Sequence, residues 1–184
     1  MANVLMGWIT KINLIDRKID CRTQLPIDTK LAHDFFFYEM MDPTTNELIL
    51  CPTLLEITQQ ARTETGYEIH TNKGLSWYRG EEYNKKVKGS PTSLHLEGLA
   101  HDSKWYKDGV QASPVCTAYE MYIRARSRGL FCEVGIYFPG YDGESTGYMH
   151  FGIHPSKSSI YYCKEKGKLI YVKSLLEVPC TLTN

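Results

Sequence analysis

The segment from His95 to Asp102 constrains the fold of this chain more than any other stretch. It places an imidazole and a carboxylate seven residues apart, with the small residues Gly98 and Ala100 between them. Neutral imidazole and carboxylate oxygen both bind zinc well, at about 2.0–2.2 Å, and a catalytic zinc site usually combines three protein ligands with one open position. If His95 and Asp102 are two ligands, the chain must bring a third from elsewhere, and His150 is the best candidate.

The pattern around His150 supports this choice. Residues 148–153 alternate as a strand does, so Met149, Phe151 and Ile153 face one way and His150 faces the other. A histidine opposite an apolar face points into a cleft or solvent. His154 lies on the same side as His150 but roughly 13 Å further along the strand, which places it in a substrate pocket at best.

His101 is the immediate neighbour of Asp102. Successive side chains of a strand point to opposite faces, so His101 does not share a metal ion with Asp102. We expect His101 to face outward.

The remaining pattern predicts an α+β domain spanning residues 1–184, with helices packed on a small, mainly antiparallel sheet. A helix is expected over 52–65, because Pro52 suits its first position and Gly66 the position after its end. A second helix is expected over 113–128, with Ser113 as its N-cap and Pro114 next. We expect strands at 67–71, 130–138 and 148–153, a final hairpin of 158–163 with 169–173, and a hairpin within 4–21. Residues 103–112 read as a polar connection, and the aromatic residues 35–38 as core.

Composition excludes several classes of protein. The chain has 21 basic and 21 acidic residues and a formal net charge of zero, so nothing suggests nucleic acid or an anionic membrane as the main partner. No run of 18 apolar residues predicts membrane insertion, and no signal peptide is expected at the N-terminus. The six cysteines form no Cys-x-x-Cys pair, so we expect reduced, mostly buried thiols.

The histidine segment also belongs to a wider pattern. It reads Ser-x-His-x-x-Gly-x-Ala-x-Asp from Ser93, followed by a late strand histidine, and it resembles the zinc D-alanyl-D-alanine carboxypeptidase and L-alanyl-D-glutamate endopeptidase family. That family shares its fold with the hedgehog signalling domain and includes many phage cell-wall lysins. Over residues 52–154 the resemblance is carried further by Leu54 with Arg62, Ser76-Trp77-Tyr78-Arg79, Tyr83-Asn84 and Val87-Lys88-Gly89.

The resemblance implies a hedgehog-type fold and a zinc peptidase that cleaves peptidoglycan stem peptides. Zinc held by His95, Asp102 and His150 would lower the pKa of a water molecule, and the hydroxide would attack a carbonyl polarised by the metal and by Arg79. The resemblance gives Arg79 the role of holding a substrate carboxylate or the growing oxyanion. Three further residues are assigned to the substrate pocket: Ser93, Tyr78 and His154.

A carboxylate must also accept the proton of the water and pass it to the leaving amine. Family members place an acid three residues before the last histidine or two residues after it, but these positions are Gly147 and Gly152 here. The hedgehog-type arrangement has its glutamate six residues before that histidine, which corresponds to Glu144. We favour Glu144 as the base, with Asp142 in the same loop and Glu133 on the preceding strand as the other acids nearby.

Two functions from different classes therefore stand. The first is a peptidase made in the cytoplasm that acts on the bacterial cell wall after release, or as part of a virion. The second is a non-catalytic binding or virion structural module that retains the zinc site. A purely structural zinc ion, its fourth position closed by a protein atom, is a third reading.

Overall fold

The computed structural model describes residues 12–13, 18–21, 28–71, 77–141, 146–165 and 168–179. The helices are α1 (Phe37–Met40), α2 (Pro52–Thr65), α3 (Glu81–Lys86) and α4 (Pro114–Ser127), with short 3-10 helices η2 (Leu94–Glu97) and η3 (Leu175–Glu177). The first strands are β1 (Ile12–Asn13), β2 (Lys18–Cys21), β3 (Leu48–Leu50) and β4 (Glu68–His70). The later strands are β5 (Ala100–Lys107), β6 (Val110–Gln111), β7 (Phe131–Tyr137), β8 (Tyr148–His154), β9 (Ser159–Cys163) and β10 (Ile170–Val172).

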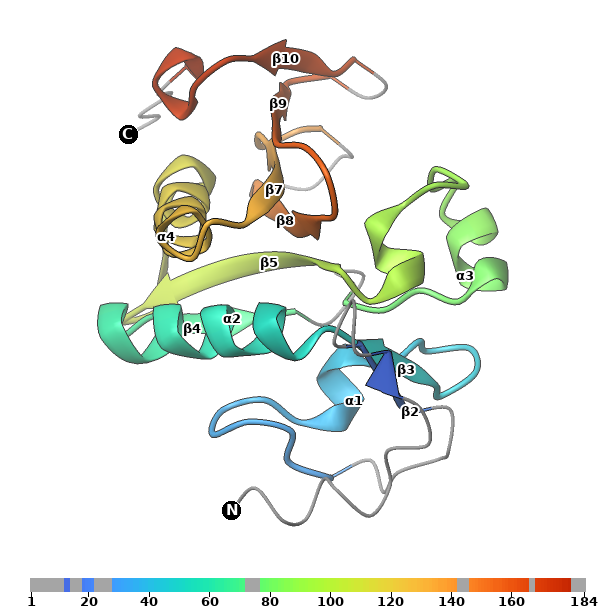
Figure 1. Cartoon of the computed structure of the whole chain (residues 1–184). Helices are drawn as coiled ribbons and strands as arrows, with labels where there is room; N and C mark the ends of the chain where they lie inside the picture. The colour runs from blue at the N-terminus through green and yellow to red at the C-terminus, as the bar shows by residue number, and fades with distance from the viewer. Residues whose placement is uncertain are drawn as a thin grey trace.

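A seven-stranded mixed sheet organises the molecule, in the order β10-β9-β7-β8-β5-β4, with β6 paired to β5. The strands of this sheet pair antiparallel except for β7 and β9, which are parallel. A second, three-stranded sheet contains β1, β2 and β3. In Figure 1, α2 runs alongside β5, and α3 lies beyond the end of β5 at which that strand begins. The predicted α+β class is confirmed.

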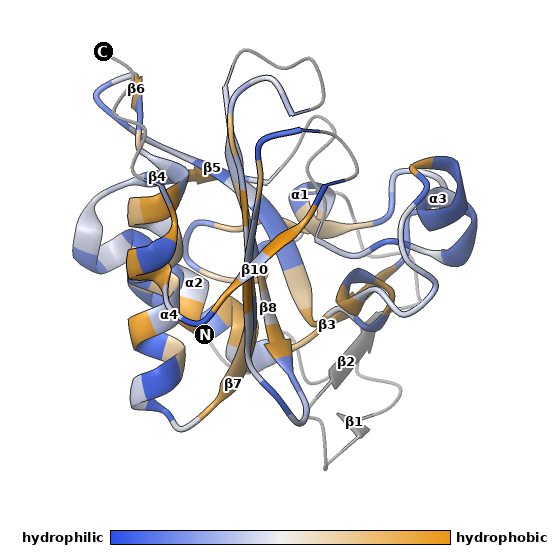
Figure 2. Cartoon of the chain, turned by 90° about the horizontal axis from the view of Figure 1, so that it is seen from above, coloured by the Kyte–Doolittle hydropathy of each residue, from blue (hydrophilic) through white to orange (hydrophobic). Residues whose placement is uncertain are grey.

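The two long helices begin and end where local chemistry predicts. Pro52 occupies the start of α2, and Gly66 follows it in the left-handed conformation at φ 70°. The Ser113 side chain accepts a hydrogen bond from the Val115 backbone N–H at the start of α4, where Pro114 comes first. Helix α4 packs against β7, β8 and α2. Figure 2 shows that α4 alternates hydrophobic and hydrophilic residues, whereas α3 is hydrophilic along most of its length.

The central strands of the large sheet have one apolar and one polar face. Met149 and Phe151 of β8 are fully buried in the core, together with Val134 and Ile136 of β7. On the opposite face, cross-strand pairing sets His150 beside Asp102 of β5 and beside Gly135 of β7. The predicted alternation in β8 is therefore confirmed, and it places His150 on the face away from α4.

One prediction about local structure needs correction. Residues 103–112 are not a connection, because β5 continues to Lys107 and turns into β6. The strand persists there because Trp105, although flanked by polar residues, is 1% exposed and packs in the core. The N-terminal hairpin is present as β1 paired with β2, while its expected residues 4–11 and 14–17 lie outside the described residues.

Four of the six cysteines fall among residues whose side chains are described, and all four are free thiols. Cys51, Cys132 and Cys163 are buried and Cys116 is exposed, in agreement with the expectation of mostly buried thiols. Across the described ranges, no helix combines the length and the apolar character needed to cross a membrane.

Candidate metal centre

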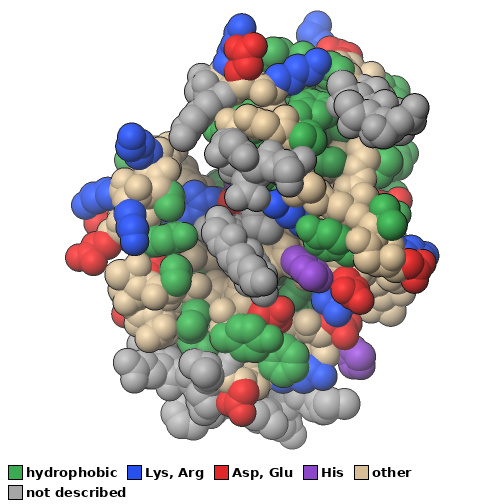
Figure 3. Space-filling view, turned by 180° about the vertical axis from the view of Figure 1, so that it is seen from behind, with side chains coloured by type: hydrophobic (Ala, Val, Ile, Leu, Met, Phe, Trp, Pro, Cys, Tyr) green, Lys and Arg blue, Asp and Glu red, His purple; other side chains and the backbone are tan. Residues whose placement is uncertain are grey.

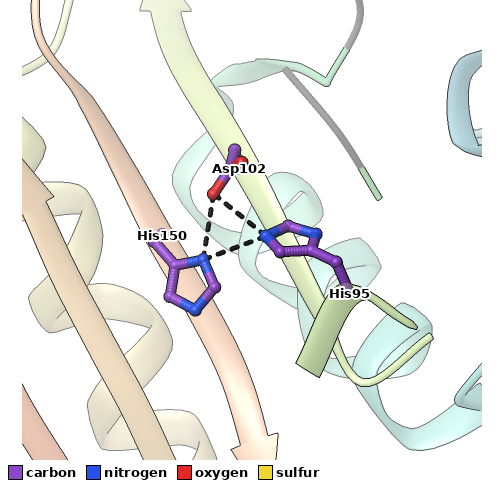
Figure 4. A group of neighbouring side chains, drawn as sticks. All are labelled: His95, Asp102 and His150. Atoms are coloured by element: carbon purple, nitrogen blue, oxygen red, sulfur yellow. Dashed lines mark hydrogen bonds and ion pairs between the residues drawn. The ribbon is translucent and has the colours of Figure 1, made fainter. Parts of the chain in front are cut away.

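The three predicted ligands meet in one buried cluster. His95 comes from η2, Asp102 from β5 and His150 from β8, and each side chain offers one ligand atom to a common point. Figure 4 shows the two imidazole rings and the carboxylate converging from these three elements. This group could hold a metal ion.

The three ligand atoms form a compact triangle. Asp102 Oδ1 lies 2.9 Å from His150 Nδ1 and 3.3 Å from His95 Nε2, and the two histidine nitrogens are 3.1 Å apart. In a tetrahedral site with bonds of about 2.0–2.1 Å, ligand atoms lie about 3.3 Å from one another. The observed edges are close to that value, so one small ion can contact all three atoms.

The local structure of η2 fixes His95. The Ser93 side chain caps η2 by accepting a hydrogen bond from the His95 backbone N–H at 3.4 Å. The His95 ring donates from Nδ1 to the Trp77 carbonyl oxygen at 2.7 Å, which leaves Nε2 without a proton and turned toward the triangle. The bond to Trp77 determines which nitrogen of His95 is available to a metal ion, and the Ser93 bond fixes the backbone from which the ring extends.

Gly98 ends η2 in close contact with the backbone of β3. It has φ 64°, and a Cβ there would lie 2.0 Å from the Ile49 carbonyl oxygen of β3. The glycine therefore permits η2 to pack on β3, and the Cys51 N–H donates to the Gly98 carbonyl oxygen at 3.1 Å.

Asp102 is oriented by Arg79. Arg79 Nη2 donates to Asp102 Oδ2 at 2.5 Å, which leaves Oδ1 directed at the two histidines. Both side chains are largely buried, so this charge-assisted bond is shielded from solvent. The Arg79 segment is held in turn by its backbone N–H, which donates to the His95 carbonyl oxygen at 3.2 Å.

The outer side of His150 faces a carboxylate. His150 Nδ1 points into the triangle, while Nε2 lies 3.2 Å from Glu133 Oε1 on the neighbouring strand β7. The two atoms are within ion-pair distance but are not aligned as a hydrogen bond. A second carboxylate, besides Asp102, is thus in direct contact with the cluster.

Burial and charge set the protonation of the three ligands. Burial lowers the pKa of His95 despite the opposing charge of Asp102. Burial alone would raise the pKa of Asp102, but the charges of His95 and Arg79 hold it well below its usual value. Burial also opposes the charged form of His150, but the Asp102 and Glu133 carboxylates outweigh it and raise the pKa of His150 to about 9.

A proton on His150 Nδ1 therefore occupies the place that a metal ion would take. It is donated to Asp102 Oδ1 at 2.9 Å, inside the triangle of ligand atoms. Metal binding must displace this proton, because one nitrogen lone pair cannot hold both. In this cluster, either the proton on His150 or a metal ion would neutralise the buried carboxylate of Asp102.

The residues predicted to line the substrate pocket or to act as base lie in different parts of the structure. Ser93 acts on the η2 backbone, as described above, and Tyr78 is buried in the core with its N–H bonded to the Met40 carbonyl oxygen. His154 ends β8 and accepts hydrogen bonds from the backbone N–H groups of residues 156 and 157. Glu144, the favoured base, lies outside the described residues.

The expectation for His101 was wrong in one respect. Its side chain does lie on the opposite face of β5 from Asp102, but that face is the core, and His101 is fully buried. Its ring stacks on Trp77 at 4.6 Å between centroids, and Nε2 lies 3.2 Å from Thr58 Oγ1 of α2. The neighbouring helix α2 covers this strand, which the local alternation could not reveal.

Both positions at which the resembled family carries acids are crowded. A Cβ at Gly147 would lie 2.3 Å from the Tyr137 carbonyl oxygen, and a Cβ at Gly152 would lie 2.7 Å from Leu94 Cδ1. A side chain at 147 would thus collide with backbone, and one at 152 would require the Leu94 side chain to move. A carboxylate for this site has to come from elsewhere in the chain.

Two contributors to the site carried no signal that singled them out in the sequence. The Trp77 carbonyl holds His95 through a backbone atom, which no motif encodes. Asp42 is fully buried and accepts hydrogen bonds from the backbone N–H groups of Thr44, Thr45 and Gly80, so it anchors the chain next to Arg79. The Asp-Pro-Thr-Thr segment that begins at Asp42 is typical of a turn, and an aspartate that caps its own turn is the one hint that the sequence offers.

A scan against models of known protein families finds no match to this sequence, and a search of curated proteins finds no match either. The function must therefore be inferred from the chemistry of the cluster and from the motif resemblance.

Proposed function

We propose that this chain is a zinc-dependent peptidase of the D-alanyl-D-alanine carboxypeptidase and L-alanyl-D-glutamate endopeptidase type, with the hedgehog-type fold that the motifs imply. The observation that carries the proposal is the triangle of His95 Nε2, Asp102 Oδ1 and His150 Nδ1, with edges of 2.9–3.3 Å. Two imidazoles and one carboxylate match the ligand set of catalytic zinc, which adds a water molecule as the fourth ligand.

Two of the three ligands also have an outer atom that is held by a hydrogen bond, as metal ligands in proteins usually do. His95 Nδ1 is held by the Trp77 carbonyl oxygen, and Asp102 Oδ2 is held by Arg79. A bound zinc ion supplies Lewis acidity, which activates water for attack and polarises a peptide carbonyl. Burial of all three ligands keeps competing water away and strengthens these effects.

The side chains around the triangle have separate roles in this proposal. Arg79 holds Asp102, and the remaining N–H groups of its guanidinium stabilise the oxyanion of the scissile carbonyl. Glu144 accepts the proton of the attacking water and delivers it to the leaving amine. Ser93, Tyr78 and His154 border or support the substrate pocket.

The substrate class follows from the resemblance. Members of the resembled family cleave peptidoglycan stem peptides, so we propose a stem peptide of the bacterial wall as substrate, with phage-encoded lysis or wall remodelling as the setting. The zero net charge gives no long-range attraction to polyanions. Recognition of the wall then depends on short-range contacts in the pocket.

Zymography on bacterial walls tests the proposal. We expect clearing by the zinc-loaded protein, loss of clearing with a chelator, and recovery when zinc is returned. His95→Ala and Glu144→Ala should abolish clearing, whereas His33→Ala, which alters an exposed histidine, should leave it unchanged. Clearing that survives both the chelator and the His95 substitution would exclude this mechanism.

A second function is favoured by one observation. Gly147 and Gly152 cannot carry a carboxylate without displacing their neighbours. A chain without a base could keep the zinc site in a non-catalytic binding or virion structural module. In that case the protein would bind zinc and bacterial walls but clear none of them, with or without chelator.

A further inference from the structure

Glu133 occupies a specific place next to the proposed metal centre. It lies on β7, directly across from Gly152 of β8 and beside Ser159 of β9. Its Oε1 atom is 3.2 Å from His150 Nε2, and its Oε2 atom accepts a hydrogen bond from Ser159 Oγ at 3.4 Å. The side chain is 28% exposed, so it reaches from the edge of the site toward a histidine that is almost fully buried.

The two nitrogens of His150 cannot serve the same purpose. Nδ1 faces Asp102 and His95, so a metal ion in the triangle would take its lone pair. A neutral imidazole that gives Nδ1 to a metal carries its proton on Nε2. That N–H is buried, and a buried donor without an acceptor destabilises the structure. The acceptor that Nε2 faces is Glu133.

The other two ligands already show the same construction. His95 Nδ1 donates to the Trp77 carbonyl oxygen at 2.7 Å, and Asp102 Oδ2 accepts from Arg79 at 2.5 Å. In each case the atom that faces away from the triangle is bound by a fixed partner. Glu133 is in the position to complete this set for His150.

Packing explains why this carboxylate comes from β7. An acid on β8 at position 152 would have its Cβ 2.7 Å from Leu94 Cδ1 and 3.1 Å from Ala100 Cβ. The cross-strand neighbour of Gly152 is Glu133, whose longer side chain approaches His150 from the next strand. The sheet register therefore brings a carboxylate to the ring although β8 itself has no room for one.

We propose that Glu133 is a positioning residue for the metal centre, which accepts the Nε2–H of His150 and thereby holds Nδ1 toward the ion. This inference depends on the metal site of the proposed function but not on peptidase activity. Partners of this kind typically contribute 10- to 100-fold to metal affinity. A carboxylate and a carboxamide oxygen can both accept the proton of Nε2, whereas a methyl group cannot.

The test is zinc affinity of the full chain, measured by competition with a chromogenic chelator. We expect Glu133→Ala to weaken zinc binding about 10- to 100-fold and Glu133→Gln to restore most of the loss. The matched control is Glu68→Ala, since Glu68 Oε2 also lies near a histidine Nε2, at 3.4 Å from His70, but on the exposed strand β4. This control should bind zinc as the unmodified protein does.

A spectroscopic readout separates positioning from a loss of folding. In the zinc-loaded protein, ¹⁵N spectra of the imidazoles should show His150 with its proton on Nε2. In Glu133→Gln, which keeps the size of the side chain, this resonance should persist with a changed shift. A circular dichroism spectrum of each metal-free variant confirms that it is folded.

Two failures have different meanings. If the unmodified protein does not bind zinc, the metal centre of the proposed function is wrong. If it binds zinc and folded Glu133→Ala binds equally tightly, the metal centre stands and the role of Glu133 is overturned. A zinc-loaded His150 with its proton on Nδ1 would overturn that role as well.

Discussion

His101 and Asp102 are neighbours in the sequence but experience opposite environments. Asp102 is an ionised carboxylate that lies beside Arg79 and His150. His101 is fully buried, and its ring lies near Trp77 and Phe151. Thr58 Oγ1 donates to the Leu54 carbonyl oxygen at 2.8 Å, so it accepts from His101 Nε2. His101 Nδ1 has no hydrogen-bond partner among the described atoms. His101 is therefore a neutral imidazole, and burial lowers its pKa to about 3.

We predict that His101 makes the metal-free protein sensitive to acid. A histidine whose pKa is lower in the folded than in the unfolded state contributes its stability above pH 6.5 and loses it as the pH falls toward 3. Between pH 7 and pH 5 this amounts to about 2 kcal/mol. In urea unfolding, His101→Phe should reduce the loss of stability over that interval by about this amount.

The control for His101→Phe is the same substitution at a histidine that is not buried. His33 is exposed and lies 2.9 Å from Asp34 at the surface. His33→Phe should leave the dependence of stability on pH close to that of the unmodified protein. An equal loss of stability between pH 7 and pH 5 in the unmodified protein and in His101→Phe would contradict the assignment of a neutral buried His101.

At the scale of elements, β7 and β9 are in close contact where Gly135 of β7 faces Tyr161 of β9. Gly135 pairs with His150 on one side and with Tyr161 on the other. A Cβ at Gly135 would lie 2.6–2.7 Å from Cε2, Cζ and the hydroxyl oxygen of Tyr161. The Tyr161 ring is stacked near His150, with 6.4 Å between the ring centroids. The hydroxyl groups of Tyr137 and Tyr161 lie 3.4 Å apart on the same face.

We predict that Gly135→Ala destabilises the protein by about 1–3 kcal/mol, because the ring of Tyr161 must move within a packed surface. In a Tyr161→Leu background the same change should cost much less. Urea unfolding of the four proteins in this cycle gives the coupling energy, which should exceed about 1 kcal/mol. Additive effects would show that the contact between Gly135 and Tyr161 does not limit the packing of these strands.

The same elements show how far the sequence could predict the structure. Helices α2 and α4 were predictable because Pro52, Gly66, Ser113 and Pro114 determine their ends locally. The cluster of His95, Asp102 and His150 was predictable because strand alternation and motif spacing direct those side chains. Helix α3 gave no such signal, since its six residues are almost all polar and have no apolar face.

Contacts between distant segments could not be predicted in this way. The contact of Glu133 with His150 depends on the register of β7 against β8, which no short pattern specifies. The buried position of His101 depends on α2 packing over β5. Both are set by tertiary arrangement, so the ligands were easier to identify than the residues that orient them.

At the scale of the whole molecule, the candidate metal centre joins η2 to the large sheet. His95 belongs to η2, which packs on β3 through Gly98, while Asp102 and His150 belong to the centre of the large sheet. On the face shown in Figure 3, acidic and basic side chains of the described residues are interspersed.

We predict that zinc stabilises the folded protein through this junction. An ion that binds only the folded state adds about 4 kcal/mol at a free concentration 1,000 times its Kd, which corresponds to roughly 10 °C in Tm for a chain of this size. Differential scanning fluorimetry should show this rise, and a chelator should reverse it. His95→Ala should abolish the rise, because it leaves two ligands on the sheet and none on η2. His33→Ala should retain it, since His33 is an exposed surface residue. An unchanged Tm of the unmodified protein at saturating zinc would contradict the idea that the three side chains act as one metal centre linking η2 to the sheet.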